Sequence, residues 1–227
     1  MTQDEAKRLV AKRAVEFVSD GMVVGLGTGS TATCFIRELA TRKLKICCVA
    51  SSDASHALAQ SLGMSVATLV ELPVLDVYID GADEIARVPG DGLGLIKGGG
   101  GALLREKIVA SAAKSFIVVA DSTKLVDHLG KFPLSVEVIQ MALPLVEPRL
   151  AALGLNPKLR PAKSGDGPFL TDEGNYILDC ACGRINDPQR TAAEIRAIIG
   201  VVEHGLFLGM ATLALVAGEN GVTEVRP

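Results

Sequence analysis

The 227-residue sequence lacks the features that would assign it to several broad classes of protein. Its uncharged runs, among them residues 205–218, are shorter than the ~20 apolar residues that span a bilayer, and glycines interrupt them. Asp4 and Glu5 precede the first apolar residues, unlike a secretory signal. The 23 Lys and Arg are balanced by 26 Asp and Glu and are scattered, which argues against a nucleic-acid interface. We therefore expect a cytoplasmic protein that binds neither membrane nor nucleic acid.

Signatures of metal and disulfide sites are also missing. The five cysteines form no C-x-x-C pair, and the three histidines lie in unrelated segments. These residues are Cys34, Cys47, Cys48, Cys180, Cys182, His56, His128 and His204. We expect no metal site, and we interpret the cysteines as reduced thiols in a reducing compartment.

The hydrophobic pattern predicts an α/β fold over the first two thirds of the chain. Thr2 and Glu5 have the spacing of a capping box, and apolar residues follow at helical intervals to Val18. Strands are expected at 22–26, 45–50, 75–79, 95–96 and 115–120, with helices to about 42, over 52–62 and to about 113. This alternation favours a doubly wound, mostly parallel, Rossmann-like sheet.

The pattern changes after Asp127. Strands at 133–138, near 158, near 169 and at 176–179, with helices ending near 153 and starting at 187, have a β-α-β-β-α-β rhythm. We therefore predict a Rossmann-like domain of residues 1–127 plus 204–227 and a smaller α+β, ferredoxin-like domain of residues 128–203. A hairpin around Asn220-Gly221 should return to the first domain.

Four polar or glycine-rich segments follow predicted strands. They are Gly27 to Thr31, Asp80 to Glu84, Lys97 to Gly101 and Asp121 to Lys124. In a parallel sheet the carboxyl ends of the strands share one edge, where ligands bind. The four segments together predict an active site at that edge.

The first segment, GTGST at 27–31, is typical of a phosphate-binding turn. Its glycines let the backbone approach a ligand, and the free N–H groups of the next helix suit an anion. A plain strand-to-helix turn is one alternative. A dinucleotide site is another, since residues 27–32 fit G-x-G-x-x-A, although Asp53 comes slightly late for the acidic residue of that motif.

The other segments supply candidate acid–base groups. Asp80, Asp83 and Glu84 are close enough to raise one another's proton affinity, and magnesium binding is the alternative use of such a group. Lys97 argues against a metal, because it can supply the positive charge itself. Four consecutive glycines at 98–101 indicate contact between backbone and ligand. Glu106 can reach the same crevice or lie on the surface, and we expect its neighbours at 105 and 107 to face solvent.

Together these motifs resemble ribose-5-phosphate isomerase of the A type. The resemblance covers nearly the whole chain and depends on GTGST at 27–31, DGADE at 80–84, KGGGGALLREK at 97–107, ADSTK at 120–124 and LGKFPLSVEV at 129–138. Three departures are Ser135 in place of a frequent proline, Ser122-Thr123 in place of a more acidic pair, and His204 in place of a common asparagine.

The resemblance implies an aldose–ketose isomerase that interconverts ribose 5-phosphate and ribulose 5-phosphate without metal or organic cofactor, as a homodimer or homotetramer. Glu106 would be the general base, Asp80 and Asp83 would handle the ring and hydroxyl protons, and Lys97 would stabilise negative charge. The implied substrate-binding residues are Lys7, Thr28, Gly29, Ser30, Thr31, Asp80, Gly81, Ala82, Asp83, Lys97, Gly98, Gly99, Gly100 and Lys124.

Three other functions compete with this interpretation. Sugar-phosphate-sensing regulators have related folds and bind the ligand without converting it. An amino-sugar phosphate deaminase would need a catalytic histidine, and none of the three lies in the predicted crevice. A nicotinamide-dependent enzyme would need the dinucleotide site considered above.

Overall fold

A seven-stranded sheet forms the larger part of the molecule. The computed structural model describes residues 1–227. The sheet has the order β14-β13-β7-β4-β1-β2-β3, and every neighbouring pair is parallel except the β13–β14 hairpin. Its strands are β1 (Val23–Leu26), β2 (Cys47–Ala50), β3 (Val66–Ala67), β4 (Val77–Asp80), β7 (Phe116–Asp121), β13 (Leu213–Gly218) and β14 (Gly221–Val225). The predicted Rossmann-like sheet and the returning hairpin are confirmed.

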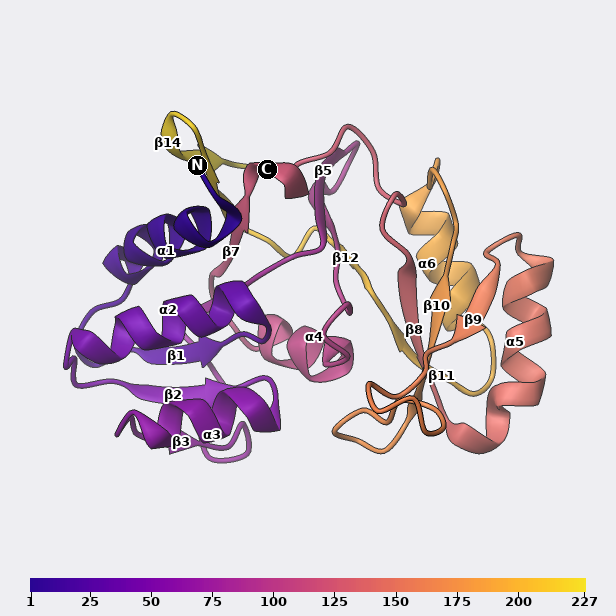
Figure 1. Cartoon of the computed structure of the whole chain (residues 1–227), viewed down its shortest axis with the longest axis horizontal. Helices are drawn as coiled ribbons and strands as arrows, with labels where there is room; N and C mark the ends of the chain where they lie inside the picture. The colour runs from indigo at the N-terminus through magenta and orange to yellow at the C-terminus, as the bar shows by residue number, and fades with distance from the viewer.

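Helices cover one face of this sheet. They are α1 (Gln3–Ala14), α2 (Ser30–Thr41) and α3 (Asp53–Ser61), and the 3₁₀ turn η1 (Val15–Phe17) follows α1. Figure 1 shows α1 and α2 lying across the strands near the N-terminus. The predicted capping box is present, because Thr2 accepts from the backbone of Glu5 and the Glu5 side chain accepts from the backbone of Thr2.

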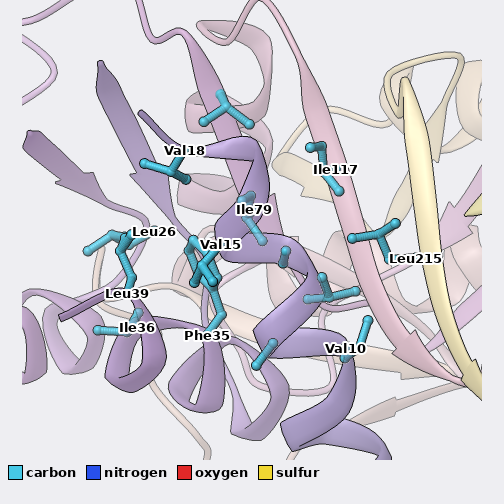
Figure 2. Close-up of a cluster of buried hydrophobic side chains, with 14 of the residues drawn as sticks. Val10, Val15, Val18, Leu26, Phe35, Ile36, Leu39, Ile79, Ile117 and Leu215 are labelled. Carbon is cyan, nitrogen blue, oxygen red and sulfur yellow. The ribbon is translucent and has the colours of Figure 1, made fainter. Parts of the chain in front are cut away.

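The apolar residues beneath these helices form a continuous core. Phe35 and Leu39 of α2 and Val10 of α1 are fully or almost fully buried against alternate residues of the central strands, such as Ile79 and Leu215 (Figure 2). Burying one such side chain stabilises the fold by roughly 1.5–3 kcal/mol. This core fixes α1 and α2 on the sheet, and with them the loops that approach the sheet's carboxyl edge.

The opposite face is covered by α4 (Leu103–Ser111) and a small antiparallel sheet. This sheet has the order β12-β6-β5, with β5 (Glu84–Val88), β6 (Gly92–Ile96) and β12 (Leu206–Leu208). Tyr78 and Phe116, whose ring centroids lie 4.9 Å apart, belong to the core of this face. Lys97 therefore follows a strand of the antiparallel sheet. Our assumption that its segment shares the edge of the parallel sheet as a strand end was wrong.

A four-stranded antiparallel unit makes up the rest of the chain. Its strands have the order β11-β8-β10-β9 and two helices pack on it, as the right-hand part of Figure 1 shows. The elements are β8 (Leu134–Val138), α5 (Leu143–Ala152), β9 (Pro157–Leu159), β10 (Tyr176–Cys180), α6 (Pro188–Arg196) and β11 (Val201–His204), with the 3₁₀ turn η3 (Gln140–Ala142). The 3₁₀ turn η2 (Ser122–Lys124) precedes the unit and follows β7. We call residues 134–204 the four-stranded unit.

This unit has the predicted β-α-β-β-α-β rhythm. The N-cap of α6 is also as predicted, since Asp187 accepts from the backbone of Arg190 and Pro188 is the first helical residue. The strand expected near Phe169 is wrong, because this segment forms only an isolated bridge between Pro161 and Pro168. The unit's core also includes residues of β5, β6 and β12. The domain boundaries at 127 and 203 stay a prediction.

Candidate active site

A polar cavity of about 150 Å³ lies at the carboxyl edge of the seven-stranded sheet. All four segments singled out in the sequence contribute to it. It is lined by Gln3, Lys7, Thr28, Gly29, Ser30, Thr31, Gly81, Ala82, Asp83, Lys97, Gly98, Gly100, Glu106, Asp121 and Lys124. Of the predicted site residues only Asp80 and Gly99 are absent from the lining.

The loop between β1 and α2 has the geometry of an anion site. Gly29 is the N-cap of α2 with φ of +93°, a left-handed conformation that a side chain would strain. The N–H groups of Gly29, Ser30 and Thr31 make no hydrogen bond within the chain. They open on the cavity that Lys7 and Lys124 also line. Free amides at a helix N-terminus beside two ammonium groups suit a phosphate.

Asp80 lies one layer behind the cavity. Its carboxylate is fully buried and accepts from the amides of Thr28 (2.9 Å) and Gly81 (2.7 Å). It also accepts from the Tyr78 hydroxyl and, at 2.8 Å, from the Lys97 ammonium. With four donors around it, Asp80 organises the loop and the lysine. Asp80 does not line the cavity, and its predicted contact with substrate stays a prediction.

Lys97 and Glu106 face each other in the cavity wall. They are 3% and 4% exposed, and the Glu106 Oε2 atom lies 3.3 Å from the Lys97 Nζ atom. The ammonium donates to Asp80 and to the carbonyl of Gly81 and meets Oε2 only as an ion pair, and Oε2 has no hydrogen-bond partner. A buried carboxylate oxygen without a donor is costly to the fold and free to take a proton.

Burial and charge set the protonation of this pair. Burial, only partly offset by the Lys97 charge, raises the pKa of Glu106 from 4.5 to about 8. Burial alone would lower the pKa of Lys97, but the carboxylates of Asp80 and Glu106 outweigh it and raise that pKa well above its usual value. The lysine is therefore a permanent cation, while the glutamate titrates near neutral pH.

The glycine segment at 98–101 contacts Asp83 on one side and the four-stranded unit on the other. The Gly99 amide donates to the Asp83 Oδ2 atom at 2.8 Å, and the amides of Gly98 and Gly100 make no hydrogen bond within the chain. An added Cβ at Gly98 would lie 2.7 Å from Ser135, and one at Gly101 would lie 2.4 Å from Phe169. The glycines are thus required by close packing as well as by an approaching ligand. The interpretation of these glycines as a sign of ligand contact alone was therefore incomplete.

Glu84 is not part of the cavity. It begins β5, and its carboxylate accepts from the amides of Gly130 (2.7 Å) and Phe132 (2.6 Å). Its role is to fix the loop that enters the four-stranded unit. Of the three carboxylates that the sequence indicated, Asp80 and Asp83 therefore remain near Lys97, and Glu106 joins them from α4.

The neighbours of Glu106 on α4 differ from each other. Arg105 is part-exposed and pairs with Asp53 (2.6 Å), Asp172 (3.4 Å) and Glu173. Lys107 is largely covered, with its side chain 11% exposed, and it donates to Glu203 and to the carbonyls of His204 and Leu206. Burial lowers its pKa to about 8. The prediction that Lys107 faces solvent was wrong.

Two lining residues, Gln3 and Asp121, were not among the individually predicted site residues, although Asp121 begins one of the four predicted segments. Gln3 donates to the Asp121 carboxylate at 3.3 Å. Asp121 also accepts from the amide of Thr123 and thereby holds the turn that presents Lys124. Gln3 precedes Lys7 by four residues on one helix, so the face shared by i and i+4 was the signal available in the sequence.

The features needed by two competing functions lie elsewhere. None of the three histidines lines the cavity, and His204 is buried, which lowers its pKa to about 3. Asp53, the candidate acidic residue of the dinucleotide motif, begins α3 and is paired with Arg105. Within residues 1–227 no group of three or more His, Cys, Asp or Glu side chains is placed to hold a metal ion. No helix is long and apolar enough to cross a membrane.

The chain is similar over its whole length to known proteins. The sequence profile of the family described as ribose 5-phosphate isomerase A (phosphoriboisomerase A) matches residues 47–221, and that of the DeoR C-terminal sensor domain matches residues 2–69. Ribose-5-phosphate isomerase A of Roseiflexus castenholzii is 51% identical over 97% of this chain and 94% of its own length. The protein of the same name from Caulobacter vibrioides is 47% identical over 100% of both chains.

Solved structures agree with the sequence match. Ribose 5-phosphate isomerase A from Methanocaldococcus jannaschii superposes with a TM-score of 0.94 at 41% identity, and 100% of each chain is covered. A D-ribose-5-phosphate isomerase in complex with phospho-erythronic acid gives a TM-score of 0.95 at 38% identity, also over 100% of each chain. With half of its residues shared over the full length, the chain belongs to the ribose 5-phosphate isomerase A family.

Proposed function

We propose that the chain interconverts D-ribose 5-phosphate and D-ribulose 5-phosphate through an enediolate. One observation carries this proposal: the Glu106 carboxylate is buried in the cavity wall with an oxygen that has no hydrogen-bond partner, 3.3 Å from a buried ammonium. A carbon acid needs such a base beside such a cation, because the proton leaves as negative charge develops on the adjacent oxygen.

The phosphate group would bind at the start of α2. The free amides of residues 29–31 and the ammonium groups of Lys7 and Lys124 line that part of the cavity. Binding energy gained there lies away from the reacting carbons, so it orients the sugar without stabilising its ground state at the reaction centre.

Asp83 would transfer the protons that move between oxygen atoms of the sugar. Opening of the furanose moves a proton from the anomeric hydroxyl to the ring oxygen, and isomerisation then moves one from O2 to O1. Asp83 lines the cavity and its Oδ1 atom has no partner in the chain, whereas Asp80 is enclosed by donors. We therefore assign these transfers to Asp83, and we assign to Asp80 the positioning of Lys97.

Glu106 would transfer the proton that moves between C2 and C1 of the sugar. It would take the proton from C2 of the open aldose and return it to C1, so that the enediolate collapses to the ketose and the carboxylate is regenerated. The Lys97 ammonium and the free amides of Gly98 and Gly100 would stabilise the oxyanion. These residues supply an acid–base pathway that needs no organic cofactor.

A sugar-phosphate sensor is the second candidate, favoured by the match of residues 2–69 to a sensor-domain profile. That segment contains the phosphate loop but none of Asp83, Lys97 and Glu106. A sensor requires only binding, so it does not explain a buried carboxylate whose retention destabilises the fold. The complete constellation favours the enzyme.

The test is conversion of ribose 5-phosphate by purified protein in the presence of a chelator. We expect turnover in the wild type and a loss of about 100- to 10,000-fold in kcat for Glu106→Gln, the usual contribution of a general base. Near-normal kcat in that variant would remove Glu106 as the base. Binding of ribose 5-phosphate without turnover by a folded wild type would favour the sensor.

Self-association and location follow from other features. The four-stranded unit exposes Ile139, Met141, Leu145, Leu170 and Ile199, and an apolar surface of this kind favours a homodimer or homotetramer. Light scattering at micromolar concentration would give the mass. All five cysteines are free thiols, which suits the reducing cytoplasm.

A further inference from the structure

Arg160 connects the four-stranded unit to the glycine segment of the cavity. It follows β9, and its side chain is 13% exposed. All three of its nitrogens donate hydrogen bonds. Nε and Nη2 donate to Asp179 at 2.8 and 2.5 Å, Nη2 donates to the Ser135 hydroxyl at 2.8 Å, and Nη1 donates to the carbonyls of Gly98 at 2.9 Å and Gly99 at 3.5 Å.

The guanidinium is fixed before it reaches the glycine segment. Asp179 of β10 binds it in a bidentate geometry, which is the most directional arrangement for an arginine and a carboxylate. Ser135 of β8 donates to the same carboxylate at 3.0 Å, and the Phe169 ring lies 5.7 Å from the Arg160 Cζ atom. Three parts of the four-stranded unit therefore direct Nη1 at the glycine segment, where its shorter hydrogen bond is to the carbonyl of the Gly98–Gly99 peptide.

That peptide lies between Arg160 and Asp83. Its carbonyl, from Gly98, accepts from the Arg160 Nη1 atom, and its N–H group, from Gly99, donates to the Asp83 Oδ2 atom at 2.8 Å. The two hydrogen bonds are on opposite ends of one planar amide, so each polarises the amide in the sense that strengthens the other. Asp83 is left with Oδ1 free towards the cavity.

We propose that Arg160 is a positioning residue for the reaction, acting through the Gly98–Gly99 peptide to hold Asp83 in the orientation that transfers the substrate's oxygen protons. The proposal rests on the proposed isomerase function. It makes the four-stranded unit part of the active site, although none of its residues lines the cavity.

The rest of the glycine segment has supports of its own. The Gly98 carbonyl also accepts from the Gly101 amide at 3.0 Å, and Ser135 and Phe169 pack directly on the backbone. Loss of Arg160 should therefore leave the path of the segment in place. What is released is the orientation of one peptide and, with it, that of the Asp83 carboxylate.

The experiment compares Arg160→Met and Arg160→Lys with Arg190→Met, a matched control. Arg190 is on α6, its side chain is 74% exposed, and it pairs only with Glu194. Three quantities are measured for each variant: kcat from ribose 5-phosphate, the rate of solvent deuterium uptake at C1 of ribulose 5-phosphate, and inhibition by inorganic phosphate.

The deuterium measurement separates proton transfer at carbon from ring opening. Ribulose 5-phosphate has no free C5 hydroxyl and cannot close a furanose ring. Deuterium uptake therefore reports proton transfer at carbon without ring opening.

We expect Arg160→Met to lower kcat by about 10- to 100-fold, the usual effect of misplacing a reacting group by about 1 Å. Deuterium uptake and phosphate inhibition should change less than about threefold. Arg160→Lys should resemble Arg160→Met, because lysine keeps the positive charge but lacks the planar guanidinium that donates to Asp179 and to Gly98 at the same time. The control should match the wild type in all three measurements.

Other results would overturn the proposal. Wild-type kcat in both Arg160 variants would show that the contact has no part in the reaction. An equal fall in kcat and deuterium uptake would show a general disturbance of the cavity, and if Arg160→Met did not fold, Arg160→Lys would decide by the same comparison. Failure of the isomerase function itself is distinct, since the wild type would then neither convert substrate nor take up deuterium.

Discussion

Replacing Glu106 by glutamine should change the stability of the protein in a pH-dependent way. The wild-type carboxyl is 4% exposed, and burial raises its pKa from 4.5 to about 8. Between these values the unfolded chain is ionised at this position while the folded chain keeps the proton. The wild type therefore loses stability as the pH rises from about 4.5 to about 8, and glutamine, which does not titrate, does not.

The size of the effect follows from the same two pKa values. Each pH unit in this window lowers the free energy of unfolding of the wild type by about 1.4 kcal/mol relative to the variant. From pH 5 to pH 8 the difference between Glu106→Gln and wild type should grow by about 3 to 4 kcal/mol in favour of the variant. Above pH 8 it should level off. A pH-independent difference in the free energy of unfolding between the two proteins, such as the loss of the ion pair with Lys97, does not alter this slope.

Urea unfolding at several pH values, followed by far-ultraviolet circular dichroism, would measure the difference. The chain has no tryptophan, so fluorescence is a poor probe. Equal dependence on urea in both proteins is needed before their free energies are compared. The same proton should control catalysis, so kcat/KM of the wild type should fall as the pH drops below about 8.

The two assays must agree for the reasoning to hold. A stability difference that stays flat from pH 5 to pH 8 would refute the buried, proton-holding carboxyl. An activity midpoint displaced by more than about one pH unit from the end of the stability slope would mean that another group is the base.

Three further predictions concern residues in and around the site. Lys7→Met should weaken inhibition by inorganic phosphate about 10-fold with little change in kcat, whereas Lys12→Met, on the exposed face of the same helix, should have no effect in the same assay. Gly27→Ala should destroy activity, because the added Cβ would lie 2.1 Å from the buried Oδ1 atom of Asp80. The Cβ of Gly29→Ala would meet no atom within 4 Å, so this variant should lower the free energy of unfolding, measured by thermal unfolding, by only about 1–2 kcal/mol of backbone strain. Glu84→Leu should lower the free energy of unfolding by about 2–3 kcal/mol, since it leaves two buried amides without an acceptor, and a stable variant would contradict that anchoring role.

The sequence was sufficient to predict which segments meet at the cavity, because the signals for these segments are local. Alternating apolar runs and helical spacings placed the main strands, and the segments at 27–31 and 121–124 do follow β1 and β7. A buried parallel strand directs whatever follows it to one edge, so no knowledge of distant contacts was needed.

Distant contacts account for the errors. The run ending at Ile96 is apolar and short, which fits a strand of any sheet, and its true partners are β5 and β12, the latter about 110 residues away along the chain. Lys107 is largely covered because Glu203 and the carbonyls of 204 and 206 accept from it. Nothing within one helical turn of Lys107 could have indicated this.

The buried position of Asp80 has a different origin. Residues i and i+2 of a strand point to the same face, so Tyr78 and Asp80 belong together, and the tyrosine hydroxyl does donate to the carboxylate. This pairing was available from the sequence and places Asp80 against the core that contains Tyr78. We had instead read the motif at 80–84 as a set of carboxylates facing one ligand.

The hydrogen bonds explain why two carboxylates beside one ammonium have different roles. Asp80 accepts from four donors, among them Lys97, so its lone pairs are engaged before any substrate arrives. The Glu106 Oε2 atom is near the same ammonium but accepts from none. A general base needs a lone pair that is free in the resting enzyme, and a positioning group needs the reverse. The two residues are therefore not interchangeable, although their distances to Lys97 differ by only 0.5 Å (2.8 and 3.3 Å).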